Sequence, residues 1–326
     1  MKIKIGIVGY GNIGKSIENE IEKFIDIELV GIFTRRNIKE VKCCSKKIYS
    51  LNDIQKFKGK IDVVIMCLGS ENDLTSYTYA IAKDFNTIDC YDNHSKIYDY
   101  FKQLNKINKK NNTVSIIGAG WDPGIFSYFR TLSDSIIPES NTYTFWGTGV
   151  SQGHSEALRR IKGVKNAIEY TIPNEDAIKK VKNNENPIFK ARDKHTRKCF
   201  VVLQNDNDLT RKNIEKQIKN MPNYFAGYDT TVQFITEEEF NLNHNKMPHG
   251  GNILTSGITG IESRVNMELL LKLESNPEFT AGILISYSRA VYRLSIEKKY
   301  ATYTTLDIPM SYISKEDNKY LIRNML

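Results

Sequence analysis

The sequence predicts an α/β protein with an open, doubly wound parallel sheet, joined to a second, α+β domain with a mixed sheet. A short apolar strand opens the chain, and a glycine-rich turn and an amphipathic helix follow it. Strands and helices then alternate, as in a doubly wound sheet. Beyond about residue 140, strands follow one another with few helices, which is typical of a mixed or antiparallel sheet. We place the first domain at residues 1–120 and the second at 121–281, with C-terminal helices at about 282–326 packing back on the first.

The first strand, Ile5–Val8, is apolar and β-branched, as expected of a strand buried on both faces of a parallel sheet. In the turn after it, Gly9 permits a tight bend, Gly11 leaves room for a pyrophosphate, and Gly14 lets helix and strand approach closely. The helix is predicted from an apolar stripe of Ile13, Ile17, Ile21 and Phe24. The free N–H groups at its start suit an anion. These features predict a Rossmann-like dinucleotide site; the alternative is a glycine-rich turn without a ligand.

The end of the second strand, Glu28–Phe33, indicates which dinucleotide to expect. Sites that prefer NAD usually carry an acidic residue about 20 residues after the glycines, where it bonds the ribose 2′-hydroxyl. This chain has Thr34, Arg35 and Arg36 at that point. Two guanidinium groups and a hydroxyl suit a 2′-phosphate, so we expect NADP rather than NAD. The alternative is that both arginines are solvated on a loop.

Three further strands of the first domain end in small or polar residues. They are expected at 62–67, 86–90 and 113–117, with a helix at about 73–84. The segments that follow them are 68–70, 91–94 and 118–124. Because ligands bind at the carboxyl ends of the strands in such a sheet, these segments are expected to line the crevice. Pro123 suits the first turn of a helix that continues through Phe126 and Phe129.

The second domain is expected to contain several strands and few helices. The strands are predicted at 142–147, 167–173, 198–203, 230–235 and 251–256, and the helices at 155–161 and 209–221. The chain is then expected to be helical again, from Arg264 to Glu274 and from Ala281 to Lys298. A short apolar tail at 307–312 follows.

The composition is that of a globular protein. Of the 326 residues, 40% are hydrophobic, and no apolar run approaches the ~20 residues of a membrane span. The net charge of +8 comes from lysines dispersed among Asn and Ile, so no nucleic-acid partner is expected, although a basic cleft for an acidic substrate is compatible with it. We expect reduced thiols and a cytoplasmic location, because neither metal-ligand nor disulfide-framework spacing is present among Cys43, Cys44, Cys67, Cys90 and Cys199.

Two strand ends of the first domain carry an aspartate, Asp92 and Asp122. Both are expected where a nicotinamide would meet its substrate. Such carboxylates could bind an ammonium group, and one of them could act as a base. The alternatives are a turn or capping role for Asp92, and an N-cap before Pro123 for Asp122.

The second domain adds polar residues suited to substrate binding: Trp146, Gln152, His154, Thr171, Arg197, His244 and His249. Arg197 is a candidate for a bidentate carboxylate contact, although Arg192 and Arg211 compete with it on sequence alone. His249 is expected in a glycine-rich turn before a strand. No HxxxH or CxxC spacing supports a metal site, and no Ser-His-Asp order with an elbow motif supports covalent hydrolysis.

Several motifs resemble one family in their order and spacing. They are Gly-Tyr-Gly-Asn-Ile-Gly (9–14), Phe-Thr-Arg-Arg (33–36), Tyr-Asp-Asn-His (91–94), Gly-Trp-Asp-Pro-Gly (120–124), Phe-Trp-Gly (145–147), Ser-Gln-Gly-His-Ser (151–155), Met-Pro-His-Gly-Gly (247–251) and Asn-Pro-Glu-Phe-Thr-Ala (276–281). On these motifs, the sequence resembles the meso-diaminopimelate D-dehydrogenases over nearly its full length. The resemblance implies NADP-dependent oxidative deamination of the D-configured carbon of meso-2,6-diaminopimelate to L-2-amino-6-oxopimelate and ammonium. It also implies a homodimer, and a reverse reaction that serves lysine and diaminopimelate biosynthesis.

The resemblance further implies roles for individual residues. Asp92 and Asp122 would be the catalytic residues at the D-amino centre. The other substrate-binding residues would be Trp146 and Gln152 near that centre, Thr171, Arg197, His249 and Asn276 at the distant L-amino acid end, and Gly153. The cofactor-binding residues would be Gly9, Tyr10, Gly11, Asn12, Ile13, Gly14, Thr34, Arg35, Arg36, Cys67, Leu68, Gly69, Ser70, Cys90, Tyr91, Asp92, Ala119, Gly120, Trp121, Asp122 and Pro123.

Two positions depart from the family pattern, and two other functions remain open. Thr34 stands where a serine is common but keeps the hydroxyl, and Glu156 stands where an aspartate is usual. One alternative is another NADP-dependent enzyme of the same plan, such as a dihydrodipicolinate reductase or an amino-acid dehydrogenase of different stereochemistry. The other is a non-catalytic NADPH sensor. The Trp-Asp-Pro and Met-Pro-His motifs argue against the first, and the polar residues of the second domain favour chemistry over sensing.

Overall fold

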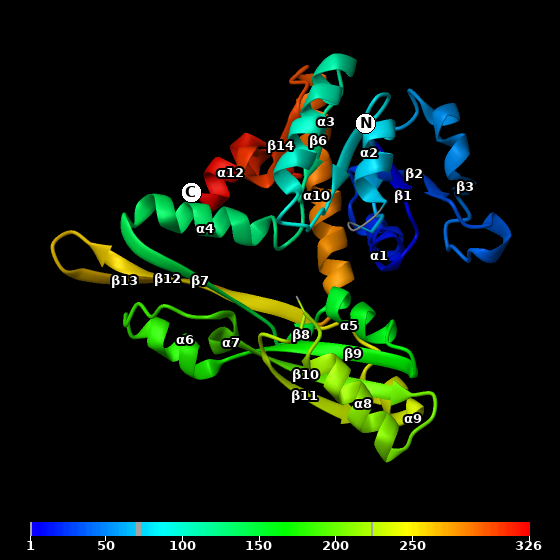
Figure 1. The fold of residues 1–326 in the computed structure, drawn as a ribbon. Coiled ribbons are helices and arrows are strands. Elements are labelled where there is room, and N and C mark those ends of the chain that lie inside the picture. The colour runs from blue at the N-terminus through cyan, green and yellow to red at the C-terminus, as the bar shows by residue number, and fades with distance from the viewer. Residues whose placement is uncertain (1, 70–72, 223) are drawn as a thin grey trace. The chain divides into compact units, whose positions relative to one another are not determined.

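The computed structural model describes residues 2–69, 73–222 and 224–326 (Figure 1). The chain forms two compact units, a first unit of Met1–Tyr128 with Pro277–Leu326 and a second unit of Phe129–Asn276. The division predicted from the sequence is after residue 120 and after residue 281. The structural boundaries lie in the helices α4 (Ile125–Ile136) and α10 (Asn276–Ile296). Because no linker marks either boundary, composition alone does not reveal them.

A seven-stranded parallel sheet forms the centre of the first unit and confirms the predicted doubly wound α/β class. Its strands are β1 (Ile3–Val8), β2 (Ile27–Thr34), β3 (Ile48–Ser50), β4 (Val63–Met66), β5 (Asn86–Asp89), β6 (Ser115–Ile117) and β14 (Thr302–Thr304). The order across the sheet is β14-β6-β5-β4-β1-β2-β3, and each neighbouring pair is parallel. The six strands β1 to β6 thus follow the order of a Rossmann sheet, to which β14 adds an edge strand.

The first unit also contains helices from both ends of the chain. They are α1 (Asn12–Glu20), α2 (Leu74–Ile81), α3 (Ile97–Asn111), α10, α11 (Met310–Ile313) and α12 (Asn318–Met325), with short 3-10 turns η1 (Ile21–Lys23), η2 (Ile38–Glu40), η3 (Leu51–Phe57) and η4 (Thr305–Asp307). In α10, Arg289 donates hydrogen bonds to both carboxylate oxygens of Asp26, at 2.7 and 2.8 Å. This pair attaches α10 to the segment before β2.

The core of the first unit lies between this sheet and its helices. The central strands β1 and β4 are buried along almost their whole length, which explains their continuous apolar sequence. Val8, Phe33 and Met66 belong to one core cluster, in which the ring of Phe57 meets that of Phe33 edge-on at 5.0 Å. Such packing fixes the carboxyl ends of the strands and therefore the loops that follow them.

The second unit contains two smaller sheets, in agreement with the predicted mixed-sheet domain. A four-stranded sheet has the order β11-β10-β9-β8, and a three-stranded antiparallel sheet has the order β13-β12-β7. The strands are β7 (Glu139–Trp146), β8 (Gly149–Val150), β9 (Val164–Pro173), β10 (His195–Leu203), β11 (Asp229–Phe234), β12 (His249–Thr259) and β13 (Ser263–Leu273). The helices are α5 (Gln152–Arg159), α6 (Glu175–Lys182), α7 (Ala191–Lys194), α8 (Asp208–Lys219) and α9 (Glu237–Asn243). Only the β10–β11 pair in the four-stranded sheet is parallel.

The predicted helix from Arg264 to Glu274 is wrong, because this segment is β13. It forms a long hairpin with β12, drawn in yellow in Figure 1, and the pairing extends from Thr259 opposite Ser263 to His249 opposite Leu273. Exposed and half-buried residues alternate along β13 with the period of a strand. Three consecutive leucines, at 269–271, obscure that alternation in the sequence.

Other differences from the predicted elements concern short segments. Neither β3 nor β14 is predicted, since each has three residues and is defined by pairing with one neighbour. Pro123 does not lie in the first turn of a helix, because α4 begins at Ile125. Asp122 is therefore not the N-cap of that helix. Among the described residues, no helix has the length and apolarity needed to cross a membrane.

Candidate active site

The glycine turn of the first unit has the geometry that its sequence predicts. Gly11 precedes α1, and a Cβ atom at Gly11 would meet no other atom within 4 Å. A Cβ atom at Gly14 would lie 2.4 Å from the carbonyl oxygen of Gly9, so only glycine fits where α1 approaches β1. Gly9 itself has φ +96°, a left-handed conformation that glycine adopts without strain. The turn thus leaves open space in front of the first N–H groups of α1, which can bind an anion.

A cavity of about 260 Å³ lies beside this turn. The predicted cofactor-binding residues that line it are Gly9, Tyr10, Gly11, Thr34, Arg35, Arg36, Cys67, Leu68 and Gly69, and Val8, Phe33 and Leu51 complete the wall. Asn12, Ile13 and Gly14 begin α1. Ser70 lies outside the described residues. These residues meet because β1, β2 and β4 are neighbours in the sheet and all end at the same edge.

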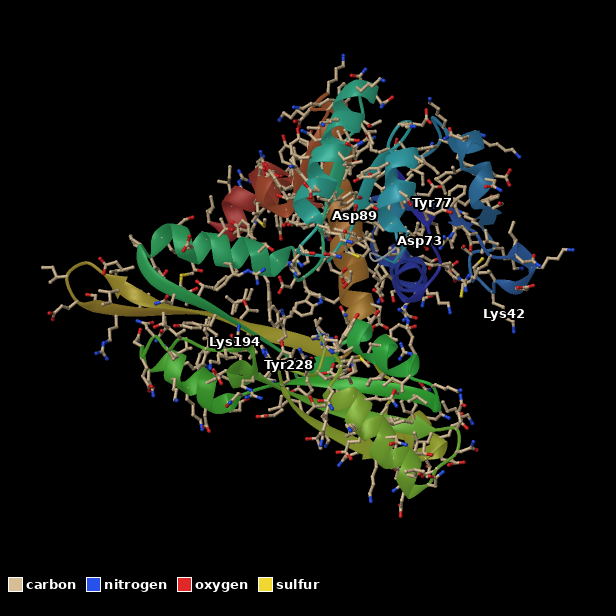
Figure 2. All side chains as sticks on the ribbon, in the orientation of Figure 1. Lys42, Asp73, Tyr77, Asp89, Lys194 and Tyr228 are labelled. Atoms are coloured by element: carbon tan, nitrogen blue, oxygen red, sulfur yellow. The ribbon has the colours of Figure 1, made fainter. Side chains whose placement is uncertain are left out.

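The two arginines after β2 have different environments. Arg35 pairs with Asp73 at 2.6 Å and lies over the ring of Tyr77 at 5.0 Å; Figure 2 labels both partners. The guanidinium group of Arg36 donates to the backbone oxygen of Tyr10 in the glycine turn. The hydroxyl of Thr34 accepts from the backbone N–H of Arg36 at 3.1 Å. Asp73 and Tyr77 therefore hold the first of these cations at the cavity, and the backbone of the glycine turn holds the second.

Glu18 is a buried carboxylate that sequence reasoning missed. Its side chain accepts a hydrogen bond from the hydroxyl of Tyr10 and others from the backbone N–H groups of Ser45, at 2.8 Å, and Cys44, at 3.3 Å. The pKa of Glu18 is lowered, since these bonds outweigh the opposing effect of burial. Glu18 thus links the glycine turn to the loop before β3. A glutamate within an otherwise ordinary helix gives no signal of this role.

The two predicted catalytic aspartates lie at the ends of β5 and β6. Asp92 is exposed and Asp122 is half-buried. Asp89, the last residue of β5, has no exposed surface and is labelled in Figure 2. One oxygen of Asp89 accepts from the N–H groups of Tyr91, at 3.0 Å, and Gly118, at 3.2 Å.

The other carboxylate oxygen of Asp89 accepts from the hydroxyl of Tyr100 at 2.6 Å. Burial raises the pKa of Asp89 to about 6, despite these three donors. The backbone oxygen of Asp89 also accepts from Ala119 at 2.8 Å. One residue therefore fixes both segments that carry the predicted catalytic aspartates.

The segment from Gly120 to Gly124 forms a tight turn that presents Asp122. The N–H group of Gly120 donates to the oxygen of Pro123 at 3.0 Å. A Cβ atom at Gly124, which has φ +131°, would lie 1.8 Å from the oxygen of Gly120. Trp121 packs edge-on against Phe126 at 5.1 Å, which attaches the turn to α4.

In the second unit, strand pairing brings together four predicted substrate-binding residues. Arg197 on β10 lies opposite Thr171 on β9, and Thr171 lies opposite Gly149 on β8. A Cβ atom at Gly149 would lie 2.3 Å from the Cα atom of His249, so β8 runs directly against the start of β12. Gly251 on β12 pairs in turn with Trp146 on β7.

Arg197 is the buried arginine of this cluster. It is 8% exposed, and its guanidinium group lies 4.2 Å above the ring of Tyr228, which Figure 2 labels. Nη1 donates to the hydroxyl of Thr171 and to a carboxylate oxygen of Glu169, the latter at 3.4 Å. Its Nε atom has no hydrogen-bond partner in the described part of the chain. A carboxylate could satisfy that donor.

The competing arginines do not share this environment. Arg211 is exposed and forms a bidentate pair with Asp206, with distances of 2.6 Å. Arg192 is exposed at the short helix α7. Of these three arginines, only Arg197 therefore lies in a buried polar cluster.

Burial keeps the histidines near Arg197 neutral at neutral pH. Burial, and then the charge of Arg197, lowers the pKa of His154 to about 4 and that of His195 to about 3. Burial also lowers the pKa of His249. His195 was not predicted as a site residue, yet its Nε2 accepts from the backbone N–H of Trp146 at 2.8 Å and its ring stacks on the indole at 5.5 Å. His195 thereby fixes the orientation of Trp146.

Two of the remaining candidates, Gln152 and Asn276, form hydrogen bonds with Met247. Gln152 donates to the sulfur of Met247 at 3.6 Å, and the N–H of Asn276 donates to the oxygen of Met247 at 3.0 Å. Gly153 is exposed in the first turn of α5. His244 belongs to an aromatic cluster instead: it bonds the hydroxyl of Tyr170 and packs on Phe200 at 4.1 Å. Among the described residues, no group of His, Cys, Asp and Glu could hold a metal ion.

A Rossmann sheet with a phosphate-binding turn, together with a separate unit that holds buried polar side chains, defines a nucleotide-dependent dehydrogenase. The family model described as "Diaminopimelic acid dehydrogenase C-terminal domain" matches residues 120–275. The meso-diaminopimelate D-dehydrogenase of Ureibacillus thermosphaericus is 48% identical over 326 residues, covering 100% of this chain and 99% of that protein. The chain therefore belongs to the meso-diaminopimelate D-dehydrogenase family, as the sequence motifs predict.

Solved structures agree with this assignment. A mutant of meso-diaminopimelate dehydrogenase from Clostridium tetani, determined with DAP, has a TM-score of 0.94 and 47% identity, with 100% of both chains covered. An engineered D-amino acid dehydrogenase bound to NADP⁺ has a TM-score of 0.89 and 36% identity, again with 100% of both chains covered. The predicted fold class is thereby confirmed over the whole chain.

Proposed function

We propose that this chain catalyses the NADP-dependent oxidative deamination of the D-configured carbon of meso-2,6-diaminopimelate. The products would be L-2-amino-6-oxopimelate, ammonium and NADPH, and the reverse amination would serve lysine and diaminopimelate biosynthesis. The observation that carries this proposal is the similarity of the whole chain to meso-diaminopimelate D-dehydrogenases, at 48% identity for the relative from Ureibacillus thermosphaericus.

The residues around the glycine turn fit NADP. The open space at Gly11 suits a pyrophosphate, and the N–H groups that begin α1 suit its charge. Arg35 and Arg36 supply positive charge for a 2′-phosphate beside Thr34. Bound NADP⁺ would supply the acceptor for hydride. The protein's part is to hold the dinucleotide at the strand ends and to favour its phosphorylated form.

We assign the support of the chemistry at the D-amino centre to Asp92 and Asp122. The amine must lose a proton before its lone pair can form an imine as hydride leaves the neighbouring carbon. A carboxylate, or a water molecule that it holds, can accept this proton. Water then adds to the imine and ammonia departs. Asp89 orients both segments through Tyr91 and Gly118, because it bonds their N–H groups.

We assign the distant L-amino acid end to the second unit. The Nε donor of Arg197, which has no partner among the described residues, is proposed to bind the carboxylate, and Thr171, His249 and Asn276 are proposed to supply further polar groups. A site with buried partners for this end penalises substrates that lack it, because its polar groups would then remain unpaired. Trp146 and Gln152 are proposed to shape the D-amino end, and Gly153 is a further proposed substrate-binding residue.

The test is formation of the reduced cofactor at 340 nm, NADPH from NADP and NADH from NAD, by the purified protein with meso-, LL- and DD-diaminopimelate. We expect turnover of the meso isomer with NADP, and at least about tenfold lower kcat/KM with NAD because Arg35 and Arg36 favour the 2′-phosphate. Activity with simple D-amino acids but not with the meso compound would contradict the substrate assignment. Tight NADPH binding without turnover would instead favour a sensor.

We also propose a homodimer in the cytoplasm. The support is the resemblance to the family for the dimer, and the absence of disulfides among the described cysteines for a reducing compartment. Sedimentation velocity of the purified protein would distinguish a dimer from a monomer of 37.4 kDa.

A further inference from the structure

Glu169 is a buried carboxylate beside Arg197 that no sequence motif indicates. It has no exposed surface and lies on β9, two positions before Thr171. Its oxygens accept from Nη1 of Arg197 at 3.4 Å and from the hydroxyl of Thr171 at 3.2 Å. The guanidinium group is thus held on one edge by Glu169 and on one face by the ring of Tyr228. The donor at Nε remains unpartnered in the described part of the chain.

The charges around this pair are few. His154, His195 and His249 have lowered pKa values and are neutral at pH 7. Burial raises the pKa of the Cys199 thiol, which lies opposite Glu169 on β10, so this group is neutral as well. Lys194, half-buried and labelled in Figure 2, lies over the ring of Trp146 at 5.8 Å. When it is ionised, Glu169 is therefore the anion paired with Arg197, and together they then carry no net charge.

We propose that Glu169 is a positioning residue that makes the Arg197 site select a zwitterionic α-amino acid end over a bare carboxylate. The inference rests on the proposed function. A zwitterionic end adds no net charge to a neutral Arg197–Glu169 pair. A bare carboxylate adds one buried negative charge without a partner, which is costly in a desolvated site.

The compound that tests this selectivity is D-2-aminoheptanedioate, which has a bare carboxylate at its far end. It keeps the D-amino centre and the chain length of meso-diaminopimelate, but lacks the amine at the far end. We would measure the ratio of KM for this compound to KM for meso-diaminopimelate, in the wild type and in Glu169→Gln. Glutamine keeps the shape and one acceptor oxygen but removes the charge. If turnover of the analogue is too slow, its inhibition constant against meso-diaminopimelate replaces KM.

At pH 8, where Glu169 is mostly ionised, we expect this ratio to fall about tenfold or more in Glu169→Gln, because the uncompensated Arg197 then accepts a bare carboxylate. Glu237→Gln is the matched control, since it removes one glutamate charge from an exposed pair with Lys165 in the same unit. The control should leave the ratio unchanged. NADPH affinity should be unchanged in both variants, which shows that the first unit is intact.

A second measurement needs only the wild type. Burial raises the pKa of Glu169 to about 7, although Arg197 opposes the shift. The KM ratio should therefore rise between pH 6 and pH 8 as Glu169 ionises. Other ionisations that change KM for both substrates by the same factor leave the ratio unchanged. In Glu169→Gln the ratio should be flat over this range.

A ratio that is independent of pH in the wild type and equal in Glu169→Gln would overturn the assignment to Glu169. A wild type that binds NADPH but does not turn over meso-diaminopimelate would instead contradict the proposed function. If Glu169→Gln does not fold, the pH series of the wild type decides alone.

Discussion

Asp89 lies at the end of β5 without exposed surface, and its carboxylate accepts hydrogen bonds from Tyr91, Gly118 and Tyr100. These donors stabilise the ionised form, but burial outweighs them and raises its pKa to about 6. A carboxyl group with a raised pKa binds a proton more tightly in the folded chain than in the unfolded chain. Its contribution to stability is therefore fully present below the unfolded pKa of 3.8 and is lost as the pH rises through about 6.

We predict that Asp89→Asn weakens the pH dependence of folding. For the wild type, the shift from 3.8 to about 6 corresponds to a loss of about 3 kcal/mol in the free energy of unfolding as the pH rises through this range. Urea denaturation from pH 4 to pH 7 should show a smaller loss in the variant. The control is Asp99→Asn, which alters an exposed pair with Lys102 at 3.2 Å. Equal pH slopes for Asp89→Asn and the wild type would show that Asp89 does not titrate in this way.

At the scale of elements, the junction of β1 and α1 contains one glycine that packing requires and another that leaves space for the cofactor. A Cβ atom at Gly14 would collide with the oxygen of Gly9 at 2.4 Å, and that oxygen is backbone that cannot move aside alone. A Cβ atom at Gly11 meets nothing within 4 Å, and its φ of −88° suits alanine. The two glycines thus serve different purposes in the same turn.

We predict that alanine at one of these glycines lowers stability, whereas alanine at the other weakens NADPH binding. Gly14→Ala should lower the free energy of unfolding by roughly 1–3 kcal/mol, because it overpacks the helix against the strand. Gly11→Ala should leave stability within roughly 1 kcal/mol but weaken NADPH binding at least about tenfold, because a methyl group enters the space for the pyrophosphate. Urea denaturation and titration of NADPH fluorescence measure the two quantities.

Gly282→Ala in α10 is the control for these glycine variants, since a Cβ atom there also meets nothing within 4 Å. It should alter neither stability nor NADPH affinity by a comparable amount. Full NADPH affinity in Gly11→Ala would mean that the pyrophosphate does not lie against this turn.

The sequence predicts an element or a site residue where the residues that act together are neighbours in the chain. The glycine turn, the arginines after β2 and the turn that ends in Gly124 are each contained in a few consecutive residues. Asp89, Glu169 and His195 are not predictable in this way, because their roles depend on partners such as Gly118, Arg197 and Trp146. These partners are brought to them by strand pairing. The same limit explains β13 and β14, which are defined by their neighbours rather than by their own sequence.

At the scale of the whole molecule, the proposed function assigns residues from each of the two compact units to the reaction. The first unit combines the N-terminal Rossmann sheet with residues from the C-terminus, including β14 and Arg289, which pairs with Asp26. The second unit holds the Arg197 cluster. We propose that the cofactor and the aspartates act in the first unit, and that the second unit recognises the L-amino acid end. We further infer that hydride leaves the D-configured carbon.

Isotope transfer tests that claim most directly. Two samples of meso-diaminopimelate would be prepared, one deuterated at the D-configured carbon and the other at the L-configured carbon. Each would be oxidised by the protein with NADP⁺, and the deuterium content of the NADPH formed would be measured by mass spectrometry. We predict one deuterium in NADPH from the first sample and none from the second. Deuterium in NADPH from the L-labelled sample, or from both samples equally, would show that hydride does not leave the D-configured carbon alone.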